Sequence, residues 1–154
     1  MRLIKKILLA IVIVAVLIQF IQPAHNKSVQ ETQMEITKLY SMPVPLQNIL
    51  KNACYDCHSN HTRYPWYVHI QPMGWLMTKH IKEGKEELNF DEFGSYSLRR
   101  QESKLRSIAS SIEKETMPLH SYTLMHSDAR LTENEKAIII DWATKTKDSL
   151  SIKN

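Results

Sequence analysis

The chain has 154 residues, of which 43% are hydrophobic, and a formal net charge of +4. This length leaves room for one small domain, and the scarcity of glycine, with only three residues, favours helices over sheets. Three of the positive charges, Arg2, Lys5 and Lys6, precede an apolar run, so the rest of the chain is close to +1. The charge therefore gives no support to a nucleic-acid partner, and we expect none.

The N-terminal segment has the pattern of an exported or membrane-anchored protein. The three cationic residues lead into an apolar run over 7–21, which Pro23 ends. Such a run is typical of a signal peptide or of a short membrane anchor. The candidate cleavage site Gln22-Pro23-Ala24 lacks the small residues that cleavage requires, so we favour an uncleaved, single-pass anchor over residues 1–23. With the cationic end inside, the rest of the chain lies on the periplasmic (extracytoplasmic) side of the cytoplasmic membrane.

The next two segments are a spacer and the first helix of the domain. Residues 24–42 are mainly polar and predict a tether that holds the domain off the membrane. Pro43 and Pro45 are suited to the first turn of a short helix, whose apolar face runs directly into Cys54.

The pentapeptide Cys54-Tyr55-Asp56-Cys57-His58 contains both cysteines of the chain. C-x-x-C-H is the attachment pattern of a c-type haem. Two thiols at this spacing reach the two vinyl groups on one porphyrin edge and form thioethers. The histidine that follows is then held under the iron as its proximal ligand. We expect one covalent haem c on Cys54 and Cys57, with His58 bound to the iron.

Other uses of this pattern fit the chain less well. A zinc site needs four ligands, and no second C-x-x-C exists, although the seven histidines leave a mixed site open. A thioredoxin-like pair belongs between a strand and a helix, a context that this sequence lacks. A local disulfide is the remaining alternative in an oxidising compartment. The predicted export agrees with the interpretation as a haem site, because c-type haem is attached after export.

The remainder of the chain predicts an all-α domain of about four helices. The two prolines make 64–72 a loop, and a helix then runs from Pro72 to about Gly84. Residues 89–96 look irregular, and another helix spans about 97–115. The capping box Thr132-x-x-Glu135 announces the last helix. We assign 43–146 to the domain and 147–154 to a polar tail.

Three runs of sequence resemble the bacterial haem-binding domain of small membrane-anchored, cytochrome c-like proteins. They are NACYDCHSNHTRYPWYVHIQP, HIKEGKEELNF and MPLHSYTLMHSDARLTENE. The resemblance covers roughly 43–143 and implies a cytochrome c-type fold around one haem. Lys85 stands where we expect arginine in this family, and lysine lacks the bidentate fork that would suit a haem propionate.

The sixth position of the iron decides between electron transfer and ligand binding. Met117 is the first candidate, because it follows a helix, precedes Pro118 and lies 59 residues after His58. His80 is the alternative, on the apolar face of its helix. His120, His126 and an open site remain as further possibilities.

Two aromatic residues are candidates for haem contact. Trp75 and Tyr67 combine an apolar ring with a polar hydrogen, so each could line the haem or bind its propionates. Plain packing in the core is the alternative for both.

The sequence favours a membrane-tethered monohaem cytochrome that transfers electrons and is not an enzyme. The membrane is a partner through the N-terminal helix, and the redox partners are unknown. A haem-based sensor or ligand-binding domain with an open or displaceable sixth site is the alternative. A peroxidase would need a distal acid–base pair, for which His80 or His120 could serve.

Overall fold

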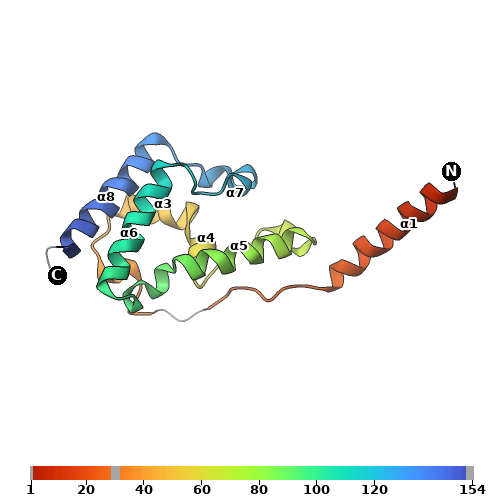
Figure 1. Cartoon of the computed structure of the whole chain (residues 1–154), viewed down its shortest axis with the longest axis horizontal. Coiled ribbons are helices and arrows are strands. Elements are labelled where there is room, and N and C mark those ends of the chain that lie inside the picture. The colour runs from red at the N-terminus through yellow and green to blue at the C-terminus, as the bar shows by residue number, and fades with distance from the viewer. Residues whose placement is uncertain (1, 29–31, 152–154) are drawn as a thin grey trace.

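The computed structural model describes residues 2–28 and 32–151 (Figure 1). Within these residues all regular elements are helices, so the all-α prediction is confirmed. The α-helices are α1 (Arg2–Leu17), α2 (Ile36–Leu39), α3 (Val44–Ala53), α4 (Tyr55–His58), α5 (Met73–Glu87), α6 (Leu98–Glu113), α7 (His120–Met125) and α8 (Glu133–Ser151). Short 3-10 helices are η1 (Ile18–Phe20), η2 (Trp66–His69), η3 (Phe90–Ser95) and η4 (Ser127–Ala129).

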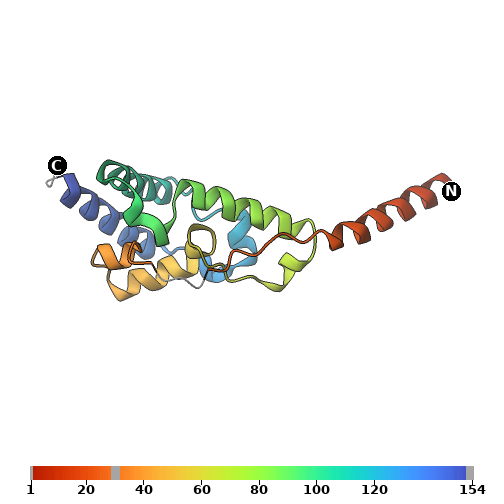
Figure 2. The same ribbon diagram turned by 90° about the horizontal axis from the view of Figure 1, so that it is seen from below.

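The N-terminal helix projects away from the rest of the molecule (Figures 1 and 2). Together α1 and η1 form a 19-residue apolar helix, Arg2–Phe20, that is long enough to cross a membrane. None of its residues is buried, and only Ile18 and Gln19 at its end are half-buried. The expected N-terminal apolar helix is therefore present.

The segment expected as a free tether instead lies against the domain. The side chain of Asn26 donates hydrogen bonds to the carbonyl of Ser59 and the hydroxyl of Thr62. Further along, Ile36 and Met42 are buried in the main core. Residues 29–31 of this segment lie outside the described residues. Apolar residues spaced too widely for a periodic pattern still contribute to the core here, which is why the sequence suggested only a spacer.

The main core lies between α3, α6 and α8, which cluster at one end of the domain (Figure 1). Leu105 and Ile112 of α6 are buried, whereas Leu98 at its start is 47% exposed. Residues 89–96, expected to be irregular, form η3 and bury Phe90 and Phe93. These two rings pack the turn between α5 and α6 onto the core.

The last helix is longer than the sequence suggested. Its capping box is formed, because Glu135 accepts hydrogen bonds from the backbone and hydroxyl of Thr132. The helix continues to Ser151, and Leu150 is buried. Residues 147–151, assigned to a polar tail, are thus part of α8. The polar side chains of this turn face solvent, while one leucine reaches the core.

Helix α5 also extends beyond its expected end at Gly84, to Glu87. A side chain at Gly84 would place its Cβ 2.8 Å from the carbonyl oxygen of Cys57. The glycine therefore serves the close packing of α5 against α4 and does not stop the helix. At the N-terminal half of α5, Met77 and Ile81 form a second, small core with Val68.

Candidate functional site

The cysteine motif forms one tight turn between α3 and α5. Helix α3 ends at Ala53, and the backbone N–H groups of Cys57 and His58 both donate to the carbonyl of Cys54. Cys54, Cys57 and His58 line the same hollow. The structure therefore brings together the three residues that the spacing predicted.

A backbone carbonyl orients the histidine of the motif. Nδ1 of His58 lies 3.0 Å from the carbonyl oxygen of Leu88, just after α5. An N–H at Nδ1 leaves the lone pair on Nε2 available for a metal. Burial lowers the pKa of His58, and its bonds to backbone carbonyls oppose that shift. The ring is thus held neutral and oriented, as a metal ligand must be.

The two cysteines are free thiols in half-buried positions. Burial, aided by the neighbouring Cys57, raises the pKa of Cys54 to about 12. Burial, aided by Asp56, raises the pKa of Cys57 to about 11. Burial therefore favours the protonated form of both thiols. No group of three or more His, Cys, Asp or Glu side chains within the described ranges could hold a metal ion.

Two adjoining hollows of about 270 Å³ and 340 Å³ meet at the motif. Both are lined by Cys54, His58 and Met117. Combined they fall within the range of roughly 300–1,000 Å³ that is usual for ligand sites. Their walls are largely apolar, with these aliphatic and thioether residues: Leu50, Met73, Leu76, Met77, Ile108, Ile112, Leu119 and Ile139. The space is large enough for a sizeable apolar group bound beside the two thiols.

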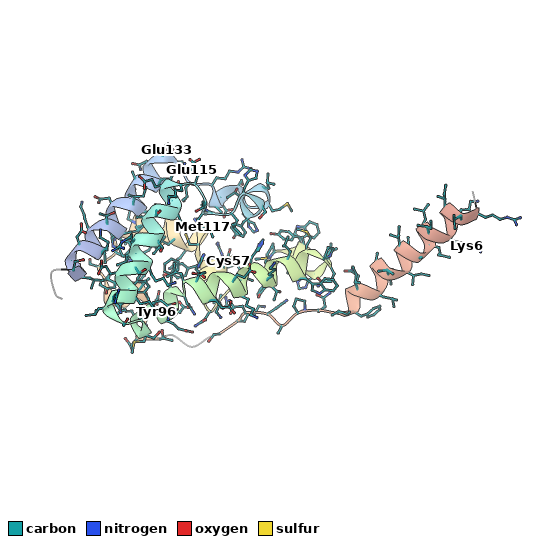
Figure 3. All side chains as sticks on the ribbon, viewed as in Figure 1. Lys6, Cys57, Tyr96, Glu115, Met117 and Glu133 are labelled. Carbon is teal, nitrogen blue, oxygen red and sulfur yellow. The ribbon has the colours of Figure 1, made fainter. Side chains whose placement is uncertain are left out.

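Met117 and Pro118 form part of the wall shared by the two hollows. Figure 3 shows Met117 beside Cys57 at the centre of the domain. Met117 is 37% exposed and is therefore not part of the buried core. The structure thus places the first candidate for a sixth ligand in the cavity with the motif.

Other residues of the cavity could also supply that ligand. His80 is half-buried and lines the first hollow, as do Met77 and Met125. Met125 was not among the ligands predicted from the sequence. A methionine on an unrecognised six-residue helix gives no periodic signal, and only the fold turns α7 towards the motif.

The two histidines after Met117 are less suited to bind a metal. His126 Nε2 is 2.6 Å from the hydroxyl of Tyr67, and its ring stacks on Tyr122 with centroids 4.1 Å apart. His120 is exposed and does not line either hollow. His120 therefore lies outside the cavity, and His126 is engaged by Tyr67 and Tyr122.

The two aromatic candidates differ in position. Tyr67 lines the first hollow. Trp75 lines neither hollow, and its indole N–H donates to the carbonyl of Ile21 at 2.9 Å. Of the two, only Tyr67 lies where it could contact a group bound at the motif.

A polar cluster behind the motif was not found from sequence. Asp56 is 4% exposed and accepts hydrogen bonds from the backbone and guanidinium of Arg63. The hydroxyl of Tyr122 donates to the same carboxylate at 2.7 Å. Burial and this bond raise the pKa of Tyr122. Asp56 inside the motif was the one sign of this cluster in the sequence. Its partners Arg63 and Tyr122 lie further along the chain, so no local pattern links them.

Lys85, the position where the family led us to expect arginine, lies away from the cavity. Its Nζ donates to the side chain of Asn26 at 2.8 Å. Lys104 lines the second hollow instead, and its Nζ is 3.6 Å from a carboxylate oxygen of Glu87. Lys104 is the one lysine or arginine among the described residues that line the two hollows.

Comparisons with known proteins agree with this geometry. A family model described as a haem-binding domain matches residues 13–145. The chain is also similar to a protein of Escherichia coli (strain K12) named cytochrome c peroxidase Ccp, with 25% identity over 125 residues. That match covers 79% of this chain and 27% of the relative. No solved structure matches the chain.

Proposed function

The chain belongs to the haem-binding domain family, and on that premise we propose that it is a monohaem c-type cytochrome that transfers electrons. Cys54 and Cys57 would hold the haem through thioethers, and His58 would bind the iron. The haem supplies a one-electron couple, and the protein supplies ligation, burial and an accessible edge.

One observation carries the proposal. The thiols of Cys54 and Cys57 and the imidazole of His58 line one apolar hollow, while Leu88 fixes the imidazole through Nδ1. A disulfide or redox pair would not require the oriented histidine or the large cavity beside it.

Met117 is the proposed sixth ligand, with His80 as the alternative. A thioether is a neutral, soft ligand that favours ferrous over ferric iron. An occupied sixth position would make electron transfer the principal activity. Lys104 is the cation in the cavity wall that could pair with a carboxylate of the haem.

We further propose that Arg2–Phe20 anchors the protein in the cytoplasmic membrane with the haem domain on the extracytoplasmic side. Arg2, Lys5 and Lys6 lie at the end of this helix that is remote from the domain, and positive residues favour the cytoplasmic side. Attachment of c-type haem after export requires the same side.

Covalent attachment is tested by expressing the full chain with a c-type maturation system. Haem should remain with the polypeptide through denaturation and acid–acetone extraction. The double variant Cys54→Ala/Cys57→Ala should lose that retention, and Cys57→Ala alone should weaken it to one thioether. A matured wild-type chain without covalent haem would refute the proposal.

A second candidate is ligand binding or peroxide chemistry at an open sixth position. The relative named cytochrome c peroxidase favours it, as does the position of His80 and Glu83 in the wall of the first hollow. An imidazole beside a carboxylate could move a proton at that wall. Rapid binding of carbon monoxide by the unmodified ferrous protein would favour this candidate over the cytochrome.

A further inference from the structure

An exposed apolar corner lies where the domain meets the N-terminal helix. Trp66 of η2 is 73% exposed, and Ile70 is 49% exposed. Phe20 and Ile21, at the end of the apolar helix, are 82% and 63% exposed. A group of exposed apolar residues at one place on a surface is typical of a site that contacts a protein or a membrane.

Hydrogen bonds hold this corner against the end of the apolar helix. Gln19 and Gln71 exchange two bonds, of 2.8 Å and 3.2 Å between side chain and backbone. Gln71 also donates to the side chain of Gln22 at 2.9 Å, and the Trp75 indole donates to the carbonyl of Ile21. The junction is therefore a bonded corner and not a free hinge.

The geometry places this corner at the membrane surface if the apolar helix spans the bilayer. The N-terminal end of α5 points towards α1, so η2 is among the parts of the domain nearest to it (Figures 1 and 2). Phe20 is the last residue of the apolar helix. The domain residues that are hydrogen-bonded to the chain around Phe20 then lie at the depth of the lipid headgroups, where tryptophan is enriched.

The charges around the corner also suit a lipid surface. Between residues 64 and 82 the sequence contains no aspartate or glutamate, and none occurs between 7 and 30. His25, Lys27 and His69 lie in these stretches, and the rings of the two histidines are 5.6 Å apart. An acid-free corner with basic groups avoids repulsion from anionic headgroups.

We propose that the corner formed by residues 66–75 inserts Trp66 and Ile70 into the interfacial layer of the lipid bilayer. The inference rests on the proposed membrane anchor. It means that the domain rests on the membrane, in one orientation, and does not hang from a spacer. Because Tyr67 and Met73 line the first hollow from this corner, that end of the haem cavity would face the membrane.

Hydroxyl-radical footprinting of the full chain in nanodiscs of phosphatidylcholine and phosphatidylglycerol tests this contact. Trp66 should be oxidised several-fold more slowly in the wild type than in Ile70→Asp, whose charge would lift the corner from the lipid. Met34, which is 47% exposed on another part of the domain, is the internal reference in both samples. Leu98→Asp, a change at a position of similar exposure on α6, should leave the Trp66 rate unchanged.

Three outcomes would contradict the inference, and they are distinguishable. Fast oxidation of Trp66 in wild-type chain that is retained in discs would overturn the lipid contact but not the anchor. The exposed corner would then be a candidate surface for a protein partner. Slow oxidation that Ile70→Asp does not relieve, with the haem spectrum unchanged, would show that Trp66 is shielded by the protein. Failure of the chain to enter the discs would overturn the anchor, and the contact with it, while the haem spectrum would still report on the haem site.

Discussion

At the scale of single residues, the motif is held by contacts that leave no room for a side chain at Gly84. An added Cβ there would lie 2.8 Å from the carbonyl oxygen of Cys57, well inside van der Waals contact. The backbone atom cannot move without disturbing the turn that presents Cys57 and His58. The effect of one methyl group therefore reports on the packing of α5 against the motif.

Gly84→Ala should destabilise the protein by about 1–3 kcal/mol, the usual cost of overpacking. Helix propensity alone would predict the opposite sign, a gain of about 0.5–1 kcal/mol for alanine inside a helix. Urea denaturation of the full chain in detergent measures the difference. Lys82→Ala, at an exposed position of the same helix, should change the stability little. A more stable Gly84→Ala variant would show that α5 does not contact the motif so closely.

The identity of the sixth iron ligand can also be tested with single substitutions. If Met117 binds the iron, the oxidised protein should show the weak far-red band of sulfur-to-iron charge transfer. Met117→Ala should remove the band, lower the reduction potential and open the iron to carbon monoxide, because a soft neutral ligand favours the ferrous state. Optical spectra and potentiometry of the two proteins measure these changes.

Two further variants serve as controls for the ligand. His80→Ala and Met125→Ala should retain the band, since both residues line the cavity but would not bind the iron. A wild type without the band, combined with carbon monoxide binding created by His80→Ala, would establish bis-histidine ligation. Loss of the band in Met125→Ala, with Met117→Ala unaffected, would transfer the ligand role to α7.

At the scale of elements, α7 is joined to α4 through one buried carboxylate. The hydroxyl of Tyr122 on α7 donates to Asp56 on α4, and Arg63 binds the same carboxylate. Since Met117 begins the loop that leads into α7, this bond fixes the far end of that loop relative to the motif. The link connects the wall that carries the candidate sixth ligand to the turn that carries the cysteines.

This link predicts a loss of stability at alkaline pH. Burial, and then the bond to Asp56, raise the pKa of Tyr122, while an unfolded chain ionises tyrosine near pH 10. The stabilisation is therefore complete below about pH 10 and falls at higher pH, because the unfolded state then binds fewer protons. Tyr122→Phe should cost about 1 kcal/mol at pH 7 and make the alkaline decline shallower. Urea midpoints between pH 7 and 11.5 measure both effects.

An unchanged alkaline slope in Tyr122→Phe would mean that Tyr122 is neither buried nor bonded to Asp56 as described. Tyr55 provides a second probe, because burial also raises its pKa. Tyr55→Phe should likewise make the decline shallower, and its effect should add to that of Tyr122→Phe if the two sites are independent.

At the scale of the whole molecule, the apolar helix and the domain are two parts joined by a bonded corner. No residue of the helix Arg2–Phe20 is buried within the chain, so its exposed apolar side chains need another apolar environment. The domain has its own core around α6 and α8. This division agrees with an anchor that carries a water-facing haem domain.

If the proposed anchor is uncleaved, the protein should fractionate with membranes. Detergent, and not high salt, should release it, because the helix is held by the hydrophobic effect and not by charge. Intact mass should include the N-terminal residues, and a protease added outside spheroplasts should digest the domain. A soluble product that starts near His25 would overturn the anchor and leave the haem proposal intact.

The sequence by itself determined the features that depend on neighbouring residues. The motif Cys54-Tyr55-Asp56-Cys57-His58, the apolar helix and the capping box at Thr132 each lie within one short stretch, so their chemistry is fixed by local spacing. Periodic apolar positions likewise predicted the main helices, since each face repeats within a few residues. The helix ends were less accurate, because packing decided whether Gly84 or Lys147 would lie inside a helix.

Only the tertiary structure decided what surrounds the motif. Leu88 reaches His58 across 30 residues, and Tyr122 reaches Asp56 across 66. Such contacts depend on how the helices pack, and no local pattern encodes a carbonyl that orients an imidazole. The same holds for Trp75, for which the sequence left two interpretations open and whose indole bonds to the carbonyl of Ile21 in the fold. The reactive groups could be identified from local sequence, because their spacing is local. Their partners and the cavity that they share were determined by long-range packing.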